Sequence, residues 1–163
     1  PLEPGQVAIA NRGYRCLYTG VDFSGWRVTE GWRSQNWQFR FDGKTDAADK
    51  SLQTSGSFGD FGFIFDVRVS GETKPCAFQL HGSDASAIVI APSLYDDALV
   101  LKGRNWNRFE GELRGDRLSL SVNGKSIFTG KKLGNVPAKG PLKIVPSGPI
   151  DFANVYVRDL AKR

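Results

Sequence analysis

Regular alternation of apolar and polar residues is the feature of this sequence that most constrains its fold. Every second residue in the segment 61–69 is Phe or Val, and residues 107–122 alternate in the same way on both sides of Gly115-Asp116. Successive side chains of a β-strand point to opposite faces, so both segments are expected to be strands with one buried face. Asn123-Gly124 tolerates positive φ and favours a tight hairpin turn. Ile64 adds an apolar residue to the polar side of 61–69, which predicts a central strand whose second face is partly covered.

Helical periodicity is nearly absent. No window of twelve or more residues has helical spacing free of Gly and Pro, and residues 45–50 are expected to form at most one or two helical turns. Two final strands are expected at 144–145 and 150–157, because the intervening Pro-Ser-Gly-Pro is a loop sequence. About ten short strands with turns between them predict an all-β fold, an antiparallel β-sandwich or jelly roll.

A chain of 163 residues is the size of one ordinary globular domain. Residues 1–13, which begin PLEPGQ, are expected to be a linker or N-terminal extension, and residues 14–163 a single β-sandwich domain. This opening, which lacks an initiator Met, predicts a processed precursor or a module of a larger protein, and we expect the latter.

Charge and hydropathy exclude two classes of partner. The net charge is +5, but the basic residues are scattered, and Lys131-Lys132 and Lys162-Arg163 are short and not interleaved with aromatic residues. We therefore expect no nucleic-acid partner. No apolar run approaches the roughly 20 residues that cross a bilayer, so we expect no membrane insertion.

Few residues suit acid–base or metal chemistry. His81 is the one histidine of the sequence, so sites that need two histidines are excluded, and we expect neither a metal nor a cofactor. Glycoside hydrolysis usually needs two carboxyl groups. Asp96 and Asp97, together with His81, are the candidate catalytic residues. Glu110 and Glu112 have suitable spacing, but alternating with arginines they are typical of a solvated strand face.

The two cysteines leave two possibilities open. Cys16 and Cys76 lie sixty positions apart and form no Cys-x-x-Cys motif. If the protein is exported they can pair across neighbouring strands, and otherwise they are small buried apolar residues.

Aromatic side chains are the most direct signal for sugar binding, because a pyranose ring stacks on an aromatic face while fixed polar groups bind its hydroxyls. Trp37 shares the phase of Phe39 and Phe41 and is expected in the core. The candidate ligand-binding residues are Trp32, Gln79, His81, Tyr95, Arg104 and Trp106.

Five segments, in order along the chain, resemble motifs of the 3-keto-disaccharide hydrolase domain family. They are residues 17–26 (LYTGVDFSGW), 59–68 (GDFGFIFDVR), 105–109 (NWNRF), 120–125 (LSVNGK) and 140–155 (beginning GPLKI). The resemblance covers residues 14–160. It implies a concanavalin A-like jelly roll and a carbohydrate-processing context in bacteria, with an extracellular or periplasmic location.

The departures from this family fall in its polar centre. Where members carry NSGIxxR, residues 74–81 read KPCAFQLH, which puts Gln79 or His81 near the place of the arginine. Residues 87–91 (AIVIA) replace a strand that carries a glutamate, Val145 replaces a glutamine, and Ala153 replaces an arginine. Loss of a catalytic acid typically costs about 10²–10⁴-fold in rate. The resemblance therefore implies the fold but not the activity.

We expect a carbohydrate-recognising or accessory module of a larger exported bacterial protein, non-catalytic, with an oligo- or polysaccharide and other domains of the parent protein as partners. Two alternatives stay open. One is a glycoside hydrolase acting on 3-keto-disaccharides or related glycosides, and the other is a structural or protein-interaction domain.

Overall fold

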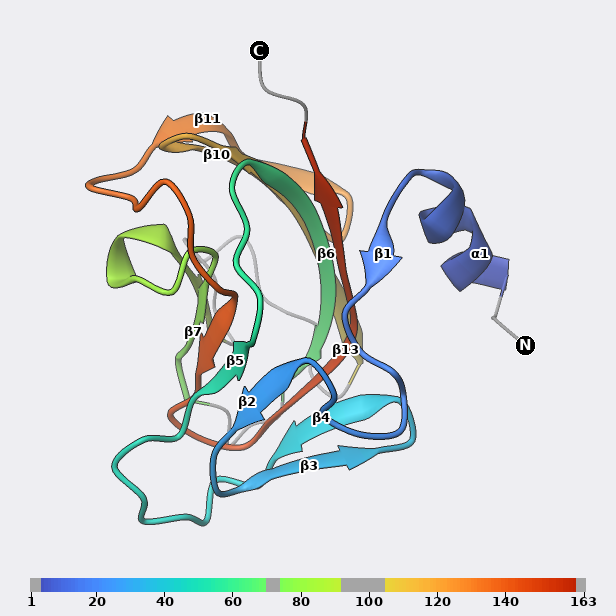
Figure 1. Ribbon diagram of the computed structural model, residues 1–163, viewed down its shortest axis with the longest axis vertical. Coiled ribbons are helices and arrows are strands. Elements are labelled where there is room, and N and C mark those ends of the chain that lie inside the picture. The colour runs from blue at the N-terminus through green and yellow to red at the C-terminus, as the bar shows by residue number, and fades with distance from the viewer. Residues whose placement is uncertain (1–3, 70–73, 92–104, 161–163) are drawn as a thin grey trace.

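The computed structural model describes residues 4–69, 74–91 and 105–160, which form two facing antiparallel β-sheets (Figure 1). The large sheet has the order β11-β10-β9-β6-β13-β4-β3, and β1 also pairs with β13. Its strands are β1 (Arg15–Cys16), β3 (Trp32–Gln35), β4 (Gln38–Phe41), β6 (Phe61–Arg68), β9 (Trp106–Arg114), β10 (Arg117–Val122), β11 (Lys125–Lys132) and β13 (Ile150–Asp159).

The small sheet has five strands in the order β2-β5-β12-β7-β8. They are β2 (Trp26–Val28), β5 (Leu52–Thr54), β7 (Cys76–Gln79), β8 (Ala87–Ile90) and β12 (Lys143–Val145). The described residues also form a helix, α1 (Pro4–Asn11), and a 3₁₀ turn, η1 (Asp84–Ser86). The expected all-β sandwich is confirmed, and so are the two final strands.

The core between the sheets is built on stacked phenylalanines. Phe65 of β6 is fully buried, and its ring centroid lies 4.0 Å from that of Phe78 in β7 and 4.9 Å from that of Phe109 in β9. The interplanar angles are 7° and 8°. Because Phe78 belongs to the small sheet and the other two to the large sheet, this stack joins the two layers.

The two predicted hairpin turns are present. Asn123 and Gly124 have φ of 51° and 80°, and Gly115 has φ of 57°, so β9, β10 and β11 follow one another as neighbouring strands. The Asn123 amide donates to Asn107 Oδ1 at 3.0 Å, and Asn123 Oδ1 accepts from the Arg108 backbone N–H. Two of the segments that resemble family motifs therefore meet in a contact that holds the hairpin.

The indole positions differ from those expected. The β3–β4 turn is made by Asn36 and Trp37, both with positive φ, so Trp37 leaves the strand phase and is 52% exposed. It lies over Gly20, where a Cβ would come within 2.2 Å of the indole ring. Trp32 is instead buried. The expectation of Trp37 in the core is wrong, because the turn includes Trp37 and β4 begins one residue later than the alternation suggests.

The segment expected to be a linker contributes to the packing. Residues 4–11 form α1, which lies on the side of the large sheet away from the small sheet (Figure 1). Ile9 and Tyr14 pack against Ile64 of β6 and Tyr156 of β13, and all four side chains are buried. This contact confirms that β6 is central with a covered second face. Residues 45–50 contain no helix.

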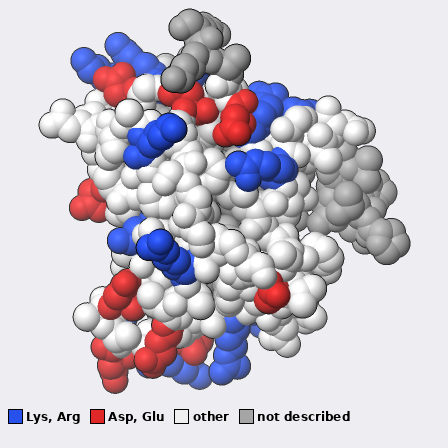
Figure 2. All heavy atoms as spheres, viewed as in Figure 1, with Lys and Arg blue, Asp and Glu red and all other residues white. Residues whose placement is uncertain are grey.

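Both cysteines are free thiols: Cys16 is exposed on the large sheet, whereas Cys76 is buried on the small sheet. Among the described residues, no helix is long and apolar enough to cross a membrane. Basic and acidic side chains are intermingled on the face drawn in Figure 2, which carries no continuous basic surface.

Candidate functional site

One cross-strand row of polar side chains runs over five strands on the outer face of the large sheet. Arg33 of β3 lies opposite Arg40 of β4, and Arg40 lies opposite Asp151 of β13. Asp151 in turn lies opposite Arg68 of β6, and Arg68 lies opposite Trp106 of β9. Residues directly opposite one another in antiparallel strands project from the same face. We call these five residues the arginine row.

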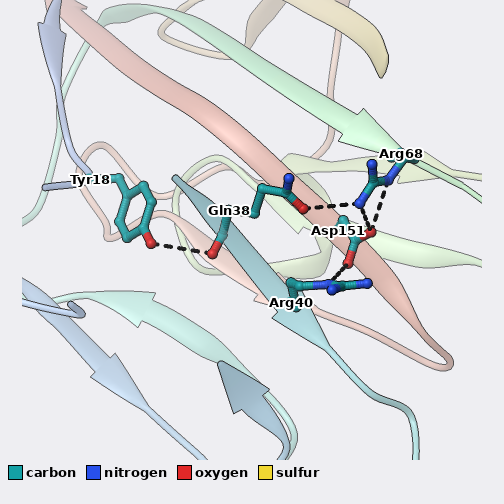
Figure 3. A network of polar contacts seen from close by, with 5 residues as sticks. All are labelled: Tyr18, Gln38, Arg40, Arg68 and Asp151. Atoms are coloured by element: carbon teal, nitrogen blue, oxygen red, sulfur yellow. Dashed lines mark hydrogen bonds and ion pairs between the residues drawn. The ribbon is translucent and has the colours of Figure 1, made fainter. Parts of the chain in front are cut away.

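The Asp151 carboxylate is the centre of this row (Figure 3). Its Oδ1 accepts a hydrogen bond from Arg40 Nε at 3.0 Å, and its Oδ2 accepts from Arg68 Nε at 3.0 Å and from a terminal nitrogen of Arg68 at 2.7 Å. The Asp151 side chain is 16% exposed, against 29% for Arg68 and 50% for Arg40. One carboxylate therefore positions two guanidinium groups.

Arg68 is held from three sides. Besides Asp151, it donates to Gln38 Oε1 at 2.9 Å, and its guanidinium lies 4.7 Å from the centroid of the Trp106 ring. The Gln38 backbone carbonyl accepts from the Tyr18 hydroxyl at 3.2 Å (Figure 3), and that hydroxyl also hydrogen-bonds to Ser34. Burial raises the pKa of Tyr18 above its ordinary value. The contacts fix Arg68 before any ligand arrives.

A recess of about 640 Å³ opens beside the arginine row, between β3, β4, β13 and the end of β6. This volume lies within the range of roughly 300–1,000 Å³ typical of small-molecule sites. Its walls carry four basic side chains and two carboxylates, for a net charge of +2. These are Arg33, Arg40, Lys44, Arg68, Asp42 and Asp151.

The neighbouring row of the same face contains a second ion pair, in which the carboxylate is buried and the arginine is exposed. Asp66 of β6 accepts two hydrogen bonds from Arg108 of β9, at 2.8 and 2.9 Å, and a third from the Asn154 amide at 2.7 Å. Asn154 has φ of 51° and lies where the β13–β6 register shifts. The Asp66 hydrogen bonds raise the pKa of Arg108. This pair is a structural support beside the recess.

In the described structure, each carboxylate that projects from β6, β9 or β13 onto the outer face has an arginine partner. Beyond Asp66 and Asp151, Glu110 pairs with Arg12, and Glu112 accepts from Arg114 at 3.1 Å. A glycosidase needs one carboxyl free to protonate the leaving group and a second free to act as base or nucleophile. Within the described part of the chain, the outer face presents no such unpaired couple.

The N-terminal segment covers the other half of this face. Tyr14 and Ile9 lie on Ile64 and Tyr156, and the Arg12 carbonyl accepts from an Arg158 guanidinium nitrogen at 3.1 Å. The arginine row and the row that contains Asp66 lie outside this contact.

Three of the residues expected to bind ligand are buried instead. Trp32 is 7% exposed and its indole N–H donates to the Lys50 carbonyl at 2.8 Å, so the expectation of a surface platform there is wrong. Gln79 is 6% exposed, with its amide donating to Asp84 at 2.9 Å. In the described structure, neither side chain reaches the recess.

His81 is 3% exposed and its ring stacks on Phe61 at 5.7 Å. One ring nitrogen lies 2.7 Å from the Pro137 carbonyl oxygen and the other 2.7 Å from that of Gly59. Both nitrogens are engaged inside the protein, which corrects the expectation of a catalytic or ligand-binding histidine at this position. His81 instead joins two loops.

Trp106 is the one predicted site residue that the described structure brings to the arginine row, and it is 36% exposed. Tyr95, Asp96, Asp97 and Arg104 lie outside the described residues. The sequence prediction missed Arg33, Arg40, Arg68 and Asp151. Each stands at a polar position of an alternating strand, but only the strand register places them in one row.

Comparisons with known proteins give the fold. No family model and no curated protein matches the chain. Among solved structures, a candidate glycosyl hydrolase from Parabacteroides distasonis aligns with a TM-score of 0.73 at 16% identity, over 99% of both chains. The carbohydrate-binding module CBM66 from Bacillus subtilis aligns with a TM-score of 0.59 at 19% identity, over 83% of this chain and 96% of that one.

The exoplasmic/lumenal domain of VIP36, solved with Ca²⁺ and Man3GlcNAc, aligns with a TM-score of 0.55 at 10% identity, over 93% of this chain and 90% of that one. At these identities the similarity establishes architecture alone. The chain has a concanavalin A-like jelly-roll fold. It resembles glycosyl hydrolases, carbohydrate-binding modules and lectins alike, and this range of functions leaves the role of the chain to its own site.

Proposed function

We propose that this chain is a non-catalytic carbohydrate-recognising module of an exported protein, and that it binds saccharide in the recess beside the arginine row. The observation that carries the proposal is the recess itself. It offers about 640 Å³ on an open sheet face, with polar groups already fixed in place and an exposed indole at the end of the row.

The chemistry of these groups suits a sugar. Saccharides need hydrogen-bond partners with fixed directions, and the Gln38, Arg68 and Asp151 side chains are held in a connected network. Groups that are ordered before binding lose less conformational entropy when the ligand arrives. Trp106 offers an apolar face on which a pyranose ring can stack. The similarity to a carbohydrate-binding module and to a lectin domain supports the same ligand class.

The pairing of carboxylates supports recognition rather than hydrolysis. Asp151 accepts three hydrogen bonds, all from arginines. Asp66 also accepts three, two from an arginine and one from an asparagine amide. Neither is free for the proton transfer that glycoside cleavage requires.

A glycoside hydrolase is the second candidate, favoured by the similarity to a candidate hydrolase over almost the full length of both chains. Asp96 and Asp97 remain the acid–base pair that this alternative proposes. His81 has no part in it, because both of its ring nitrogens contact backbone carbonyls.

One experiment separates the candidates. The domain is incubated with a panel of neutral and acidic oligosaccharides and with 3-keto-disaccharides, while calorimetry measures affinity and mass spectrometry measures product release. We expect binding without cleavage. We also expect Trp106→Ala to weaken binding by about fivefold or more, since loss of a stacking aromatic costs about 1 kcal/mol or more.

The matched control is Trp37→Ala, which removes another exposed indole, in the β3–β4 turn. It should leave affinity unchanged. Release of monosaccharide that disappears in Asp97→Ala would establish the hydrolase instead. If no saccharide of the panel binds, the proposed function is refuted.

A further inference from the structure

The row of charges in the recess selects a particular kind of saccharide. We infer that the ligand carries an anionic group, a carboxylate or a sulfate, which binds between Arg33 and Arg40. This inference rests on the proposed function and names the substrate class of the same site.

The first observation is a pair of like charges. Arg33 and Arg40 are directly opposite each other on β3 and β4. Directly opposed residues in antiparallel strands have Cβ atoms about 4.5–5.5 Å apart, and like charges at this position are destabilising. Both side chains are at least partly exposed, so the sheet core does not require arginine at either position.

The second observation is that no carboxylate in the described part of the chain pairs with Arg33. Asp151 is occupied by Arg40 and Arg68, and Asp42 accepts from the Lys44 backbone N–H at 2.8 Å. Within the three described ranges, no hydrogen bond or ion pair joins the Arg33 side chain to any residue. Its guanidinium therefore has its donors available toward the recess.

The third observation is the charge that surrounds this donor. The walls of the recess, which include the Lys44 side chain, carry a net charge of +2. A cleft lined by one sign of charge concentrates ligands of the opposite sign. The planar guanidinium fork matches a carboxylate or sulfate with two parallel hydrogen bonds.

An anionic sugar therefore satisfies all three features together. Its charged group takes the Arg33 donors and offsets the repulsion from Arg40, while its ring and hydroxyls use Arg68 and the rest of the row. A neutral sugar would leave the charge of Arg33 uncompensated, since Asp151 pairs with Arg40 and Arg68.

The test compares the same sugar with and without its charge. A tetrasaccharide of galacturonic acid and its fully methyl-esterified form are titrated into the domain by calorimetry at low and at high salt, with a sulfated tetrasaccharide as a third arm. We expect the acid to bind at least about tenfold more tightly than the ester, and the difference to shrink at high salt. The sulfated arm distinguishes carboxylate from sulfate as the preferred group.

Arg33→Gln should remove the preference for the acid. Arg27→Gln is the matched control, because Arg27 is an exposed arginine on β2 of the small sheet, and it should retain the preference. A second readout needs no ligand: Arg33→Gln should unfold at the same or a higher urea concentration than the parent, since it relieves the repulsion with Arg40.

The outcomes are distinguishable. Equal affinity for acid and ester refutes the anionic preference and leaves the proposed function standing. A preference that survives Arg33→Gln refutes the assignment to this arginine. Absence of binding by every saccharide refutes the proposed function and this inference with it.

Discussion

Replacing Asp151 by Asn should destabilise the fold measurably, because it leaves Arg40 and Arg68 beside each other without the carboxylate between them. A hydrogen bond to a charged group is worth roughly 1.5–3 kcal/mol when partly buried, which applies to Arg68. Arg40 is half exposed, so its ion pair with Asp151 should contribute as much to stability as a surface ion pair, about 0.2–1 kcal/mol. Asparagine keeps one acceptor oxygen, so we expect a net loss of about 1–3 kcal/mol in the free energy of unfolding.

The assay is urea denaturation of Asp151→Asn beside the control Asp116→Asn, which removes the same charge from an exposed turn. Asp116 has only a 3.9 Å contact to Arg117, so its loss should stay within about 0.5 kcal/mol. High salt should reduce the difference between the two variants. Equal stabilities for Asp151→Asn and Asp116→Asn would refute the view that this carboxylate organises the row.

Three further predictions follow from other parts of the structure. Phe65→Ala should lose about 3–5 kcal/mol in urea denaturation, because it empties the stack that joins the two sheets, and a loss below about 1 kcal/mol would contradict that packing. Burial raises the pKa of Tyr156 to about 12. Its contribution to stability should therefore be full below about pH 10 and be lost as the pH rises toward 12. Tyr156→Phe should remove a phenol that titrates near pH 12 from an ultraviolet pH titration. His81→Ala should lower the unfolding midpoint without changing saccharide affinity of the folded protein, whereas a selective loss of affinity would return His81 to the site.

Much of the fold was predictable from local patterns. The alternation around Phe65 and the Asn123-Gly124 turn each specify a short stretch of backbone, and the structure contains both. Ile64 even indicated that something covers the second face of β6. The identity of that cover could not be predicted, because α1 has little amphipathic character and depends on the tertiary contact of Ile9.

The candidate site was much less predictable. Arg40 and Asp151 are 111 positions apart, and their contact depends on the register of two strands, which no local pattern specifies. Aromatic residues were misplaced for a related reason: the turn at Asn36 shifts the phase, which exposes Trp37 and leaves Trp32 in the core. Residue type alone does not distinguish a buried indole from a surface platform.

The most direct test of saccharide recognition at the arginine row is to map the contact surface. Backbone amide chemical shifts of the isotope-labelled domain are followed while the tightest-binding oligosaccharide is titrated in. We predict that the largest chemical-shift changes fall on β3, β4, the start of β13 and the end of β6, the strands that form the recess. Largest changes on the small sheet, with the arginine row unaffected, would contradict it.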